Sequence, residues 1–340
     1  MKDYFASLDE TKKQYFNILC DEIPEFLNDY INTPEMQKQN GISVSCGTIY
    51  SKMFDQMWYS SLDHSVAVAL IIWNFTKDQK QTLSGLFHDI ATPVFKHSID
   101  FMNKDYEKQE STEELTTKII KESKEIMALL ERDGIKLEEV NDYHIYPIAD
   151  NDTPQLSSDR LEYTLSNGLG ATERLWGLED VKEIYKNIEI QRNEEGIEEL
   201  GFKDKKIAEK FVHTMGILAA MYRRGKTIFS MQLLADIMKK MSDRNLITIN
   251  DLYSLSEKEV IEKIENCDED NISKCFKQWK NATQINESDE SAEGKYYVSI
   301  EKQKKRYINP LVNVEGSYVR IKDISDTAKQ DIEKSLSFNA

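Results

Sequence analysis

The sequence predicts a mainly α-helical protein with a small mixed α and β appendage at its C-terminal end. Apolar residues recur at three- and four-residue intervals over most of the 340 residues, which is the helical period. Only six prolines interrupt this pattern, and proline is a strong helix breaker. Near the C-terminus the segment KYYVSIEKQKKRYINPLV changes to the two-residue alternation that is typical of strands.

Changes in composition divide the chain into three expected parts. Residues 1 to 50 form an N-terminal helical segment, with an amphipathic stretch at 9 to 27 and a loop-like segment at 34 to 47. Residues 51 to 265 form a helical core, and 40% hydrophobic content is enough to fill a large one. Residues 266 to 340 begin with a charged, loop-rich stretch and form the α and β appendage.

The core elements follow in order along the chain. HSVAVALIIWNF, which starts at His64, is apolar on nearly all sides, as expected of a central helix. DQKQTLSGLFHDI forms a second helix that Pro93 ends. Residues 141 to 158 carry two prolines and several turn-forming residues, so they form an ordered loop. Ser157 or Ser158 then caps the helix DRLEYTL. Further helices are expected at 112 to 133, 180 to 195 and 204 to 241.

Charge and composition exclude several classes of function. A formal net charge of −16 disfavours nucleic acid and anionic membranes as partners, so any phosphate site must supply its own local positive charge. No apolar run is long enough to cross a bilayer, and the N-terminus lacks the apolar stretch of a signal peptide. We therefore expect a cytoplasmic protein. The four cysteines have no CxxC spacing, which indicates reduced thiols.

The histidines gather in one part of the chain and indicate a metal site. Four of the five lie between His64 and His144. A His-Asp pair, His88 and Asp89, stands where a helix should turn, so its imidazole and carboxylate can converge on one ion. His64 from the preceding helix and Asp159 from a later helix start complete two nitrogen and two oxygen ligands. This set suits manganese, iron, magnesium, nickel or zinc and leaves positions for water and a phosphate oxygen.

A plain structural interpretation remains open for the same residues. A single histidine on an apolar helix is usually a hydrogen-bonded core residue, so the chain could be a helical interaction protein that binds no metal. His213, in FVHTMGIL, is expected to be such a core histidine. Residues 231 to 241 contain methionines at helical spacing and are expected to face the core.

Four blocks in order, SLDHSVAV, GLFHDIATPVFKHS, QEST and SSDRLEY, resemble a known family. They are similar to the HD-domain metal-dependent phosphohydrolases, and within that superfamily to the deoxynucleoside triphosphate triphosphohydrolase branch, whose blocks read RxxHS, HDxGHxPFxH, HE and DRxDY. The resemblance covers about residues 51 to 170 and implies an HD-domain helical bundle for the core.

The resemblance also implies roles for individual residues. It makes His64, His88, Asp89 and Asp159 the metal ligands, in agreement with the pattern above. His97 matches a histidine beside the scissile phosphate and becomes the candidate general acid. Glu110 matches the acidic residue that would orient His97 or hold water. Tyr163, one helical turn after Asp159, can touch substrate. The family also makes a homo-oligomer plausible.

Several positions depart from the family pattern around this site. Ser61 replaces the expected arginine, Thr92 and Gln109 replace histidines, and Ser166 and Asn167 replace an arginine and an aspartate. The resemblance therefore implies an intact metal centre in a pocket rebuilt for another ligand. Candidate groups to contact that ligand are Thr92, Lys96, Arg160, Tyr163 and the basic cluster at residues 302 to 306. In the loop, His144 and Tyr146 could stack on a base, and one of residues 150 to 152 could support the ligands.

The expected function is metal-dependent hydrolysis of a nucleotide or another small phosphate ester or anhydride, with a metal-activated water attacking phosphorus. Two alternatives remain open beside it. One is a phosphodiesterase or monophosphatase on the same site. The other is a non-catalytic sensor that binds metal and nucleotide, which the replacements at Ser61 and Thr92 motivate.

Overall fold

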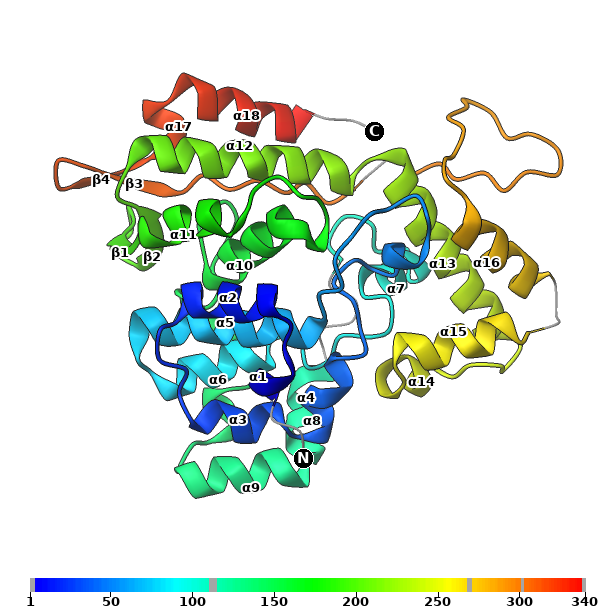
Figure 1. The fold of residues 1–340 in the computed structure, drawn as a ribbon, viewed down its shortest axis with the longest axis horizontal. Helices are drawn as coiled ribbons and strands as arrows, with labels where there is room; N and C mark the ends of the chain where they lie inside the picture. Colours follow the sequence, from blue (N-terminus) through cyan, green and yellow to red (C-terminus); the bar gives the residue numbers. More distant parts are fainter. Residues whose placement is uncertain (1–3, 110–114, 268–270, 301–302, 338–340) are drawn as a thin grey trace.

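The computed structural model describes residues 4–109, 115–267, 271–300 and 303–337. The prediction of a mainly α-helical fold is confirmed, and the described strands form one small four-stranded sheet. Most helices pack around one of two main hydrophobic cores. Figure 1 shows the helices of the larger core as one group and those of the smaller core as a second group beside it.

The larger core surrounds α5 (Ser61–Thr76), which is buried along most of its length, as expected of a central helix. It packs most closely on α6 (Gln79–Phe87) and on α10 (Ser158–Ser166). The surrounding helices are α1 (Tyr4–Ser7), α2 (Glu10–Leu19), α3 (Phe26–Ile31), α4 (Pro34–Gln39), α8 (Thr116–Glu122), α9 (Lys124–Asp133), α11 (Leu178–Lys186), α12 (Lys205–Tyr222), α17 (Ile321–Ile324) and α18 (Asp326–Ser337).

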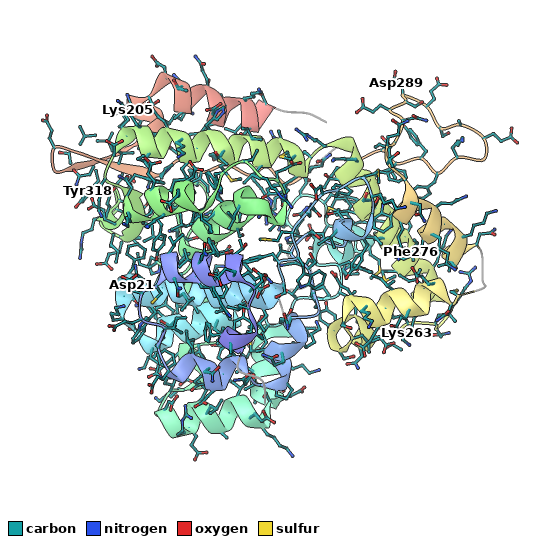
Figure 2. All side chains as sticks on the ribbon, in the orientation of Figure 1. Asp21, Lys205, Lys263, Phe276, Asp289 and Tyr318 are labelled. Atoms are coloured by element: carbon teal, nitrogen blue, oxygen red, sulfur yellow. The ribbon has the colours of Figure 1, made fainter. Side chains whose placement is uncertain are left out.

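The smaller core is built on α13 (Gly225–Asp243), which packs against α7 (His97–Met102). Met231, Met238 and Met241 are buried, as predicted for this stripe. The other helices of this group are α14 (Ile249–Ser254), α15 (Glu257–Glu265) and α16 (Ile272–Asn281). A long exposed loop follows α16, and Figure 2 shows Asp289 at its outer edge.

The sheet joins two distant parts of the chain in the order β1 (Ile188–Arg192), β2 (Glu198–Phe202), β3 (Leu311–Val314) and β4 (Ser317–Arg320). The outer pairs are antiparallel, whereas β2 and β3 are parallel. The C-terminal helix α18 lies along α12 (Figure 1). Figure 2 places Lys205 and Tyr318 at the edge formed by α12 and the β3–β4 hairpin. The division of the chain at residue 265 stays a prediction.

Several predicted elements differ from the structure. The segment expected to be loop-like at 34 to 47 begins with the helix α4, which has a proline at its first position. The expected helix at 180 to 195 ends at Lys186, and β1 follows because a turn at Asn193 and Gly196 lets this segment pair with β2. The helix expected at 204 to 241 is two helices, separated where Arg224 adopts an extended conformation. Among the described residues of KYYVSIEKQKKRYINPLV, only the final residues belong to a strand, β3.

Two further corrections concern a helix and a histidine. The helix expected at 112 to 133 is interrupted at Ser123, whose hydroxyl accepts a hydrogen bond from Ile126 N and caps α9; residues 112 to 114 lie outside the described part. His213 is not a core residue, because its side chain is 59% exposed and its Nδ1 lies 3.0 Å from Asp331 of α18. None of the helices in the described part of the chain combines the length and apolar character that crossing a bilayer requires.

Candidate metal centre

His64 lies in the first turn of α5, and the start of that helix is strongly fixed. Ser60 accepts a hydrogen bond from Asp63 N, while the Asp63 carboxylate accepts one from Ser60 N, which is a capping box. Asp63 is almost fully buried and also accepts hydrogen bonds from Lys12 and Tyr4. The helix start that carries His64 is therefore held in place by paired, buried groups.

His88 and Asp89 follow the last residue of α6, where the chain turns. Ile90 N donates to Phe87 O and Thr92 N donates to Asp89 O, so the backbone leaves the helix at the His-Asp pair, as predicted. Asp159 lies in the first turn of α10, whose N-cap is Ser157. Three separate helix ends thus bring the predicted metal ligands to one place.

The distances between these side chains describe a compact cluster. His64 Nε2 lies 3.1 Å from His88 Nε2 and 3.1 Å from Asp159 Oδ1. His88 Nε2 lies 3.8 Å from Asp159 Oδ1 and 3.9 Å from Asp89 Oδ2. Neighbouring ligands at right angles around an ion with bonds of about 2.1 Å are about 3 Å apart, and opposite ligands are about 4.2 Å apart. The observed separations fall in this range.

The hydrogen bonds behind the two imidazoles determine where their protons lie. His88 Nδ1 lies 2.7 Å from Gly85 O, and a carbonyl can only accept, so His88 carries its proton on Nδ1. His64 Nδ1 donates to the buried carboxylate of Glu162 in the same way. In the neutral tautomers both Nε2 atoms therefore present lone pairs to each other and to Asp159. Lone pairs this close repel unless a cation lies between them, so the donor set fits a divalent metal ion.

Electrostatics lead to the same conclusion. Burial opposes the charged form of His64, but Glu162 and Asp159 outweigh burial and raise its pKa to about 10. Burial also opposes the charged form of Asp159, yet His64 and His88 hold the pKa of that carboxyl below its usual range. The site thus stabilises positive charge at its centre, either a proton or a metal ion.

Glu162 was not among the residues identified from sequence. Its fully buried carboxylate accepts hydrogen bonds from Tyr15 (3.0 Å), Tyr59 (2.6 Å) and His64. A signal was available in the block SSDRLEY, because residues three apart on a helix share a face and Glu162 is three after Asp159. This arrangement is the carboxylate and histidine pair that commonly orients a metal ligand from behind.

We predict that Glu162→Gln weakens metal binding by about 10- to 100-fold, the usual effect of losing such a partner. The amide can donate to His64 Nδ1 and favour the tautomer whose Nε2 carries the proton, so the metal ligand would be lost without a large change in shape. Titration of the metal-free protein with Mn²⁺ measures this effect. The exposed Glu198→Gln serves as a control and should bind metal normally. Unchanged affinity in Glu162→Gln would contradict the orienting role.

Lys96 brings positive charge to the cluster. Its Nζ lies 2.6 Å from Asp89 Oδ2 and 3.4 Å from Ser61 Oγ. Burial opposes the charged forms of both groups, but the attraction between them is stronger. It keeps the pKa of Asp89 well below its ordinary value and the pKa of Lys96 above its ordinary value. Phe95 and Lys96 both have positive φ angles, 64° and 41°, a conformation that costs about 1–3 kcal/mol per residue and is frequent at functional sites.

His97 begins α7 and lines the same pocket as the cluster. Its Nδ1 lies 2.9 Å from Oδ2 of Asp100, a fully buried carboxylate on the same helix that sequence reasoning did not single out. Burial lowers the pKa of His97, Asp100 opposes this, and the charges of Arg306 and Lys96 lower the pKa further. Glu110, the predicted partner of His97, lies outside the described residues.

The cluster opens into a cavity of about 590 Å³ between the two cores, a size that suits a small-molecule ligand. Thr92, Lys96 and Tyr163 line it, as does Arg160. The Arg160 guanidinium, however, is engaged locally, with hydrogen bonds to Asp150 (2.9 Å), Asn151 (2.8 Å) and Gln155 O (2.8 Å). Arg160 thus fixes the loop before α10, and residues 150 and 151 support the helix that carries Asp159.

The loop at residues 141 to 158 borders the cavity on the metal side. The Tyr143 ring lies 5.2 Å from that of His88 and 4.4 Å from that of His144. His144 lines the cavity, although its side chain is 57% exposed and its Nδ1 pairs with Asp142. Tyr146 turns away, because its hydroxyl donates to Glu139 O. Tyr143, not Tyr146, is the aromatic residue of this loop that reaches the site.

Comparison with solved structures establishes the fold. A crystal structure of a hypothetical protein from Aquifex aeolicus superposes with a TM-score of 0.65 at 17% identity, covering 93% of this chain and 95% of that one. A crystal structure of a phosphohydrolase from Bacteroides thetaiotaomicron VPI-5482 superposes with a TM-score of 0.57 at 13% identity, covering 89% of this chain and 92% of that one. The fold is therefore one that a phosphohydrolase uses.

Sequence similarity to a curated protein covers a smaller part of the chain than the structural similarity does. The chain is 25% identical over 141 residues to the uncharacterized protein YdhJ of Bacillus subtilis strain 168, which is 41% of this chain. The matched part spans about two fifths of that protein's length, 42%. No family model matches the sequence.

Proposed function

We propose that this chain is a metal-dependent phosphohydrolase of the HD type that acts on a nucleotide or another small phosphate ester or anhydride. The observation that carries the proposal is the convergence of His64 Nε2, His88 Nε2 and Asp159 Oδ1 as three lone-pair donors within 3.1 to 3.8 Å, with Asp89 beside them. The fold shared with a phosphohydrolase supports it.

When bound, a divalent ion polarises a phosphoryl oxygen and lowers the pKa of a bound water. The protein's own residues hold and orient the reactants. His64, His88, Asp89 and Asp159 would hold the ion, Glu162 and Gly85 O fix the imidazoles, and Lys96 adds positive charge at the edge of the cluster. The cavity walls enclose the reacting groups and reduce the access of bulk water.

His97 carries the proton transfer in this proposal. Asp100 fixes the Nδ1 side of its ring and stabilises the charged imidazolium. An anionic substrate lying between Lys96 and Arg306 cancels the charges that lower the pKa of His97. The protonated His97 then delivers its proton to the departing oxygen.

We predict that Asp100→Asn lowers kcat by about 10- to 1,000-fold and leaves bound metal unchanged, because an amide can hold the wrong tautomer of His97. If Asp100 only stabilised the fold, its substitution would not shift the pH dependence of kcat. The pKa of the alkaline limb of the kcat profile, where His97 loses its proton, should fall because the neutral amide no longer stabilises the imidazolium. A kcat profile that matches wild type in height and position would contradict the role.

Phosphate release tests the proposed function as a whole. Purified protein supplied with Mn²⁺ is given nucleoside mono-, di- and triphosphates, sugar phosphates and phosphodiesters, and the product is identified as phosphate, pyrophosphate or tripolyphosphate. Hydrolysis of any of these supports a phosphohydrolase and names its substrate class. Tight nucleotide binding without product would contradict catalysis and favour the sensor, whereas cleavage of diesters alone would favour the phosphodiesterase.

A further inference from the structure

The turn that follows α6 is held by two side chains from one short helix. We call residues 88 to 97 the HD turn, because it begins with the His-Asp pair. Gln39 Nε2 donates to Ile90 O (2.6 Å), and Lys38 Nζ donates to Thr92 O (2.6 Å). The two donors are the last residues of α4. The end of α4 therefore holds the backbone of the HD turn directly after the two candidate metal ligands.

The segment after α4 is also attached to the start of α5, the helix that carries His64. Ser61 N donates to Ile42 O (2.7 Å), and Val44 N donates to Tyr59 O (3.1 Å). Helix α4 itself packs against α5 (Figure 1). The end of α4 thus connects the two parts of the chain that provide three of the four candidate ligands, so the spacing of these ligands depends on it.

The HD turn adopts a conformation that requires support from outside. Phe95 and Lys96 both have positive φ angles, which residues other than glycine rarely adopt. Such strain persists only where the surrounding structure fixes it. Besides α4, Leu252 O accepts a hydrogen bond from Val94 N (2.8 Å). Gly47 lies so close to the Phe95 ring that an added Cβ would be 2.6 Å from it. Losing one of these supports would let the turn move, together with the ligands at its start.

Gln39 is fully buried, and its Oε1 has no hydrogen-bond partner among the described residues. A buried polar atom without a partner destabilises the fold, so the amide does not serve stability alone. Because a carbonyl oxygen can only accept, the atom of Gln39 that faces Ile90 O is the amide nitrogen. The benefit of this side chain therefore lies in its donor, which reaches the residue next to Asp89.

We propose that Gln39 is a positioning residue of the metal centre, assisted by Lys38, and that their hydrogen bonds fix where the HD turn places Asp89. Gln39 acts through the backbone of the turn, since its amide is used for Ile90 O. This proposal rests on the function proposed above. A displacement of about 1 Å in a catalytic site is enough to lower the rate by about a hundredfold, so a support of this kind affects both metal binding and turnover.

The test compares Gln39→Met with Gln191→Met in the full chain. Gln191 is a closely matched control on β1, outside the cavity. It is almost fully buried, its Nε2 donates to Phe202 O (2.9 Å), and its Oε1 is also without a partner in the described part of the chain. Three quantities are measured for each variant: the Mn²⁺ affinity of the metal-free protein, kcat at saturating Mn²⁺, and the melting temperature of the metal-free protein.

We expect Gln39→Met to bind Mn²⁺ about tenfold more weakly and to lower kcat by about 10- to 100-fold. Gln191→Met should keep both values close to those of wild type. The two variants should change the melting temperature by similar amounts, because each removes one buried amide that donates to a backbone carbonyl. A merely structural role of Gln39 would change the melting temperature and leave the affinity and kcat of the folded protein unchanged.

Lys38→Met tests the second support independently, and it keeps the proposal testable if Gln39→Met does not fold. It removes the donor to Thr92 O and should lower kcat by about tenfold. Its control is Lys203→Met, which also removes a lysine that donates to a backbone carbonyl, Lys186 O (3.0 Å), but at an exposed position. Lys203→Met should turn over substrate like wild type.

The outcomes separate this proposal from the proposed function. Wild type that binds no Mn²⁺ would overturn both. Wild type that binds Mn²⁺ and releases phosphate, beside a Gln39→Met variant with the affinity and kcat of Gln191→Met, would overturn the positioning role alone. If Gln39→Met does not fold, a Lys38→Met variant with the kcat of Lys203→Met would overturn it in the same way.

Discussion

Asp89→Ala is expected to lose both the bound metal and the phosphate-releasing activity. The substitution removes a charged oxygen donor from the cluster, and none of the described residues offers a carboxylate that can replace it there. Loss of the ion removes several kcal/mol of transition-state stabilisation, and about 4 kcal/mol corresponds to about a thousandfold in rate. Elemental analysis and phosphate release, measured on the same preparation as wild type, provide the two readouts.

Two controls separate this effect from damage to the fold. Asp89→Ala also leaves Lys96 without its ion-pair partner, so Asp89→Asn, which keeps the side-chain shape and one neutral oxygen, should lose metal and activity as well. Asp243→Ala removes an aspartate that is 57% exposed at the end of α13 and should behave like wild type. Full metal content in a folded Asp89→Ala protein would contradict the assigned site.

His97→Ala is expected to keep its metal and to lose turnover by about 10²- to 10⁴-fold, the usual contribution of a positioned acid or base. His97 lies on α7 and contacts Asp100, so its removal leaves the four ligands and their partners Glu162 and Gly85 in place. The Michaelis constant should change little, because the proton is transferred in the transition state. Steady-state kinetics with a substrate found in the panel measures both constants.

The comparison variant for His97 is His213→Ala. It removes an exposed histidine that also pairs with an aspartate, Asp331, but lies away from the cavity on α12. Its kinetics should match wild type. If His97→Ala turned over substrate as fast as His213→Ala, the proton would have another carrier, and His144, which lines the same cavity, would be the residue to examine.

The helical fold was accessible from sequence because local periodicity carries it. The near-continuous apolar pattern of α5 and the cap at Ser157 are local signals, and the structure has both features. The sheet was not accessible in the same way. Strand β2 pairs with β3, which lies more than a hundred residues further along the chain, and strands of four or five residues leave too short a pattern to be distinguished from a helix.

The candidate site, too, could be predicted from the sequence only in part. The cluster of His64, His88, Asp89 and Asp159 was predicted from spacing, and the structure brings these residues together; their role as ligands stays a prediction. The carboxylates that contact His64 and His97, Glu162 and Asp100, were missed, because their importance shows only once a helix face or turn is known to meet an imidazole. The described part of the basic cluster, residues 303 to 306, lines the cavity from a segment far along the chain, and sequence spacing alone does not show that it lies there.

The most direct test of the central claim is X-ray diffraction from a crystal of the Mn²⁺-loaded protein, recorded above and below the manganese absorption edge. We expect an anomalous peak within about 2.0–2.3 Å of His64 Nε2, His88 Nε2 and one carboxylate oxygen each of Asp89 and Asp159. A fully loaded crystal with no peak at this cluster, or with manganese bound elsewhere and His64 hydrogen-bonded directly to His88, would contradict it.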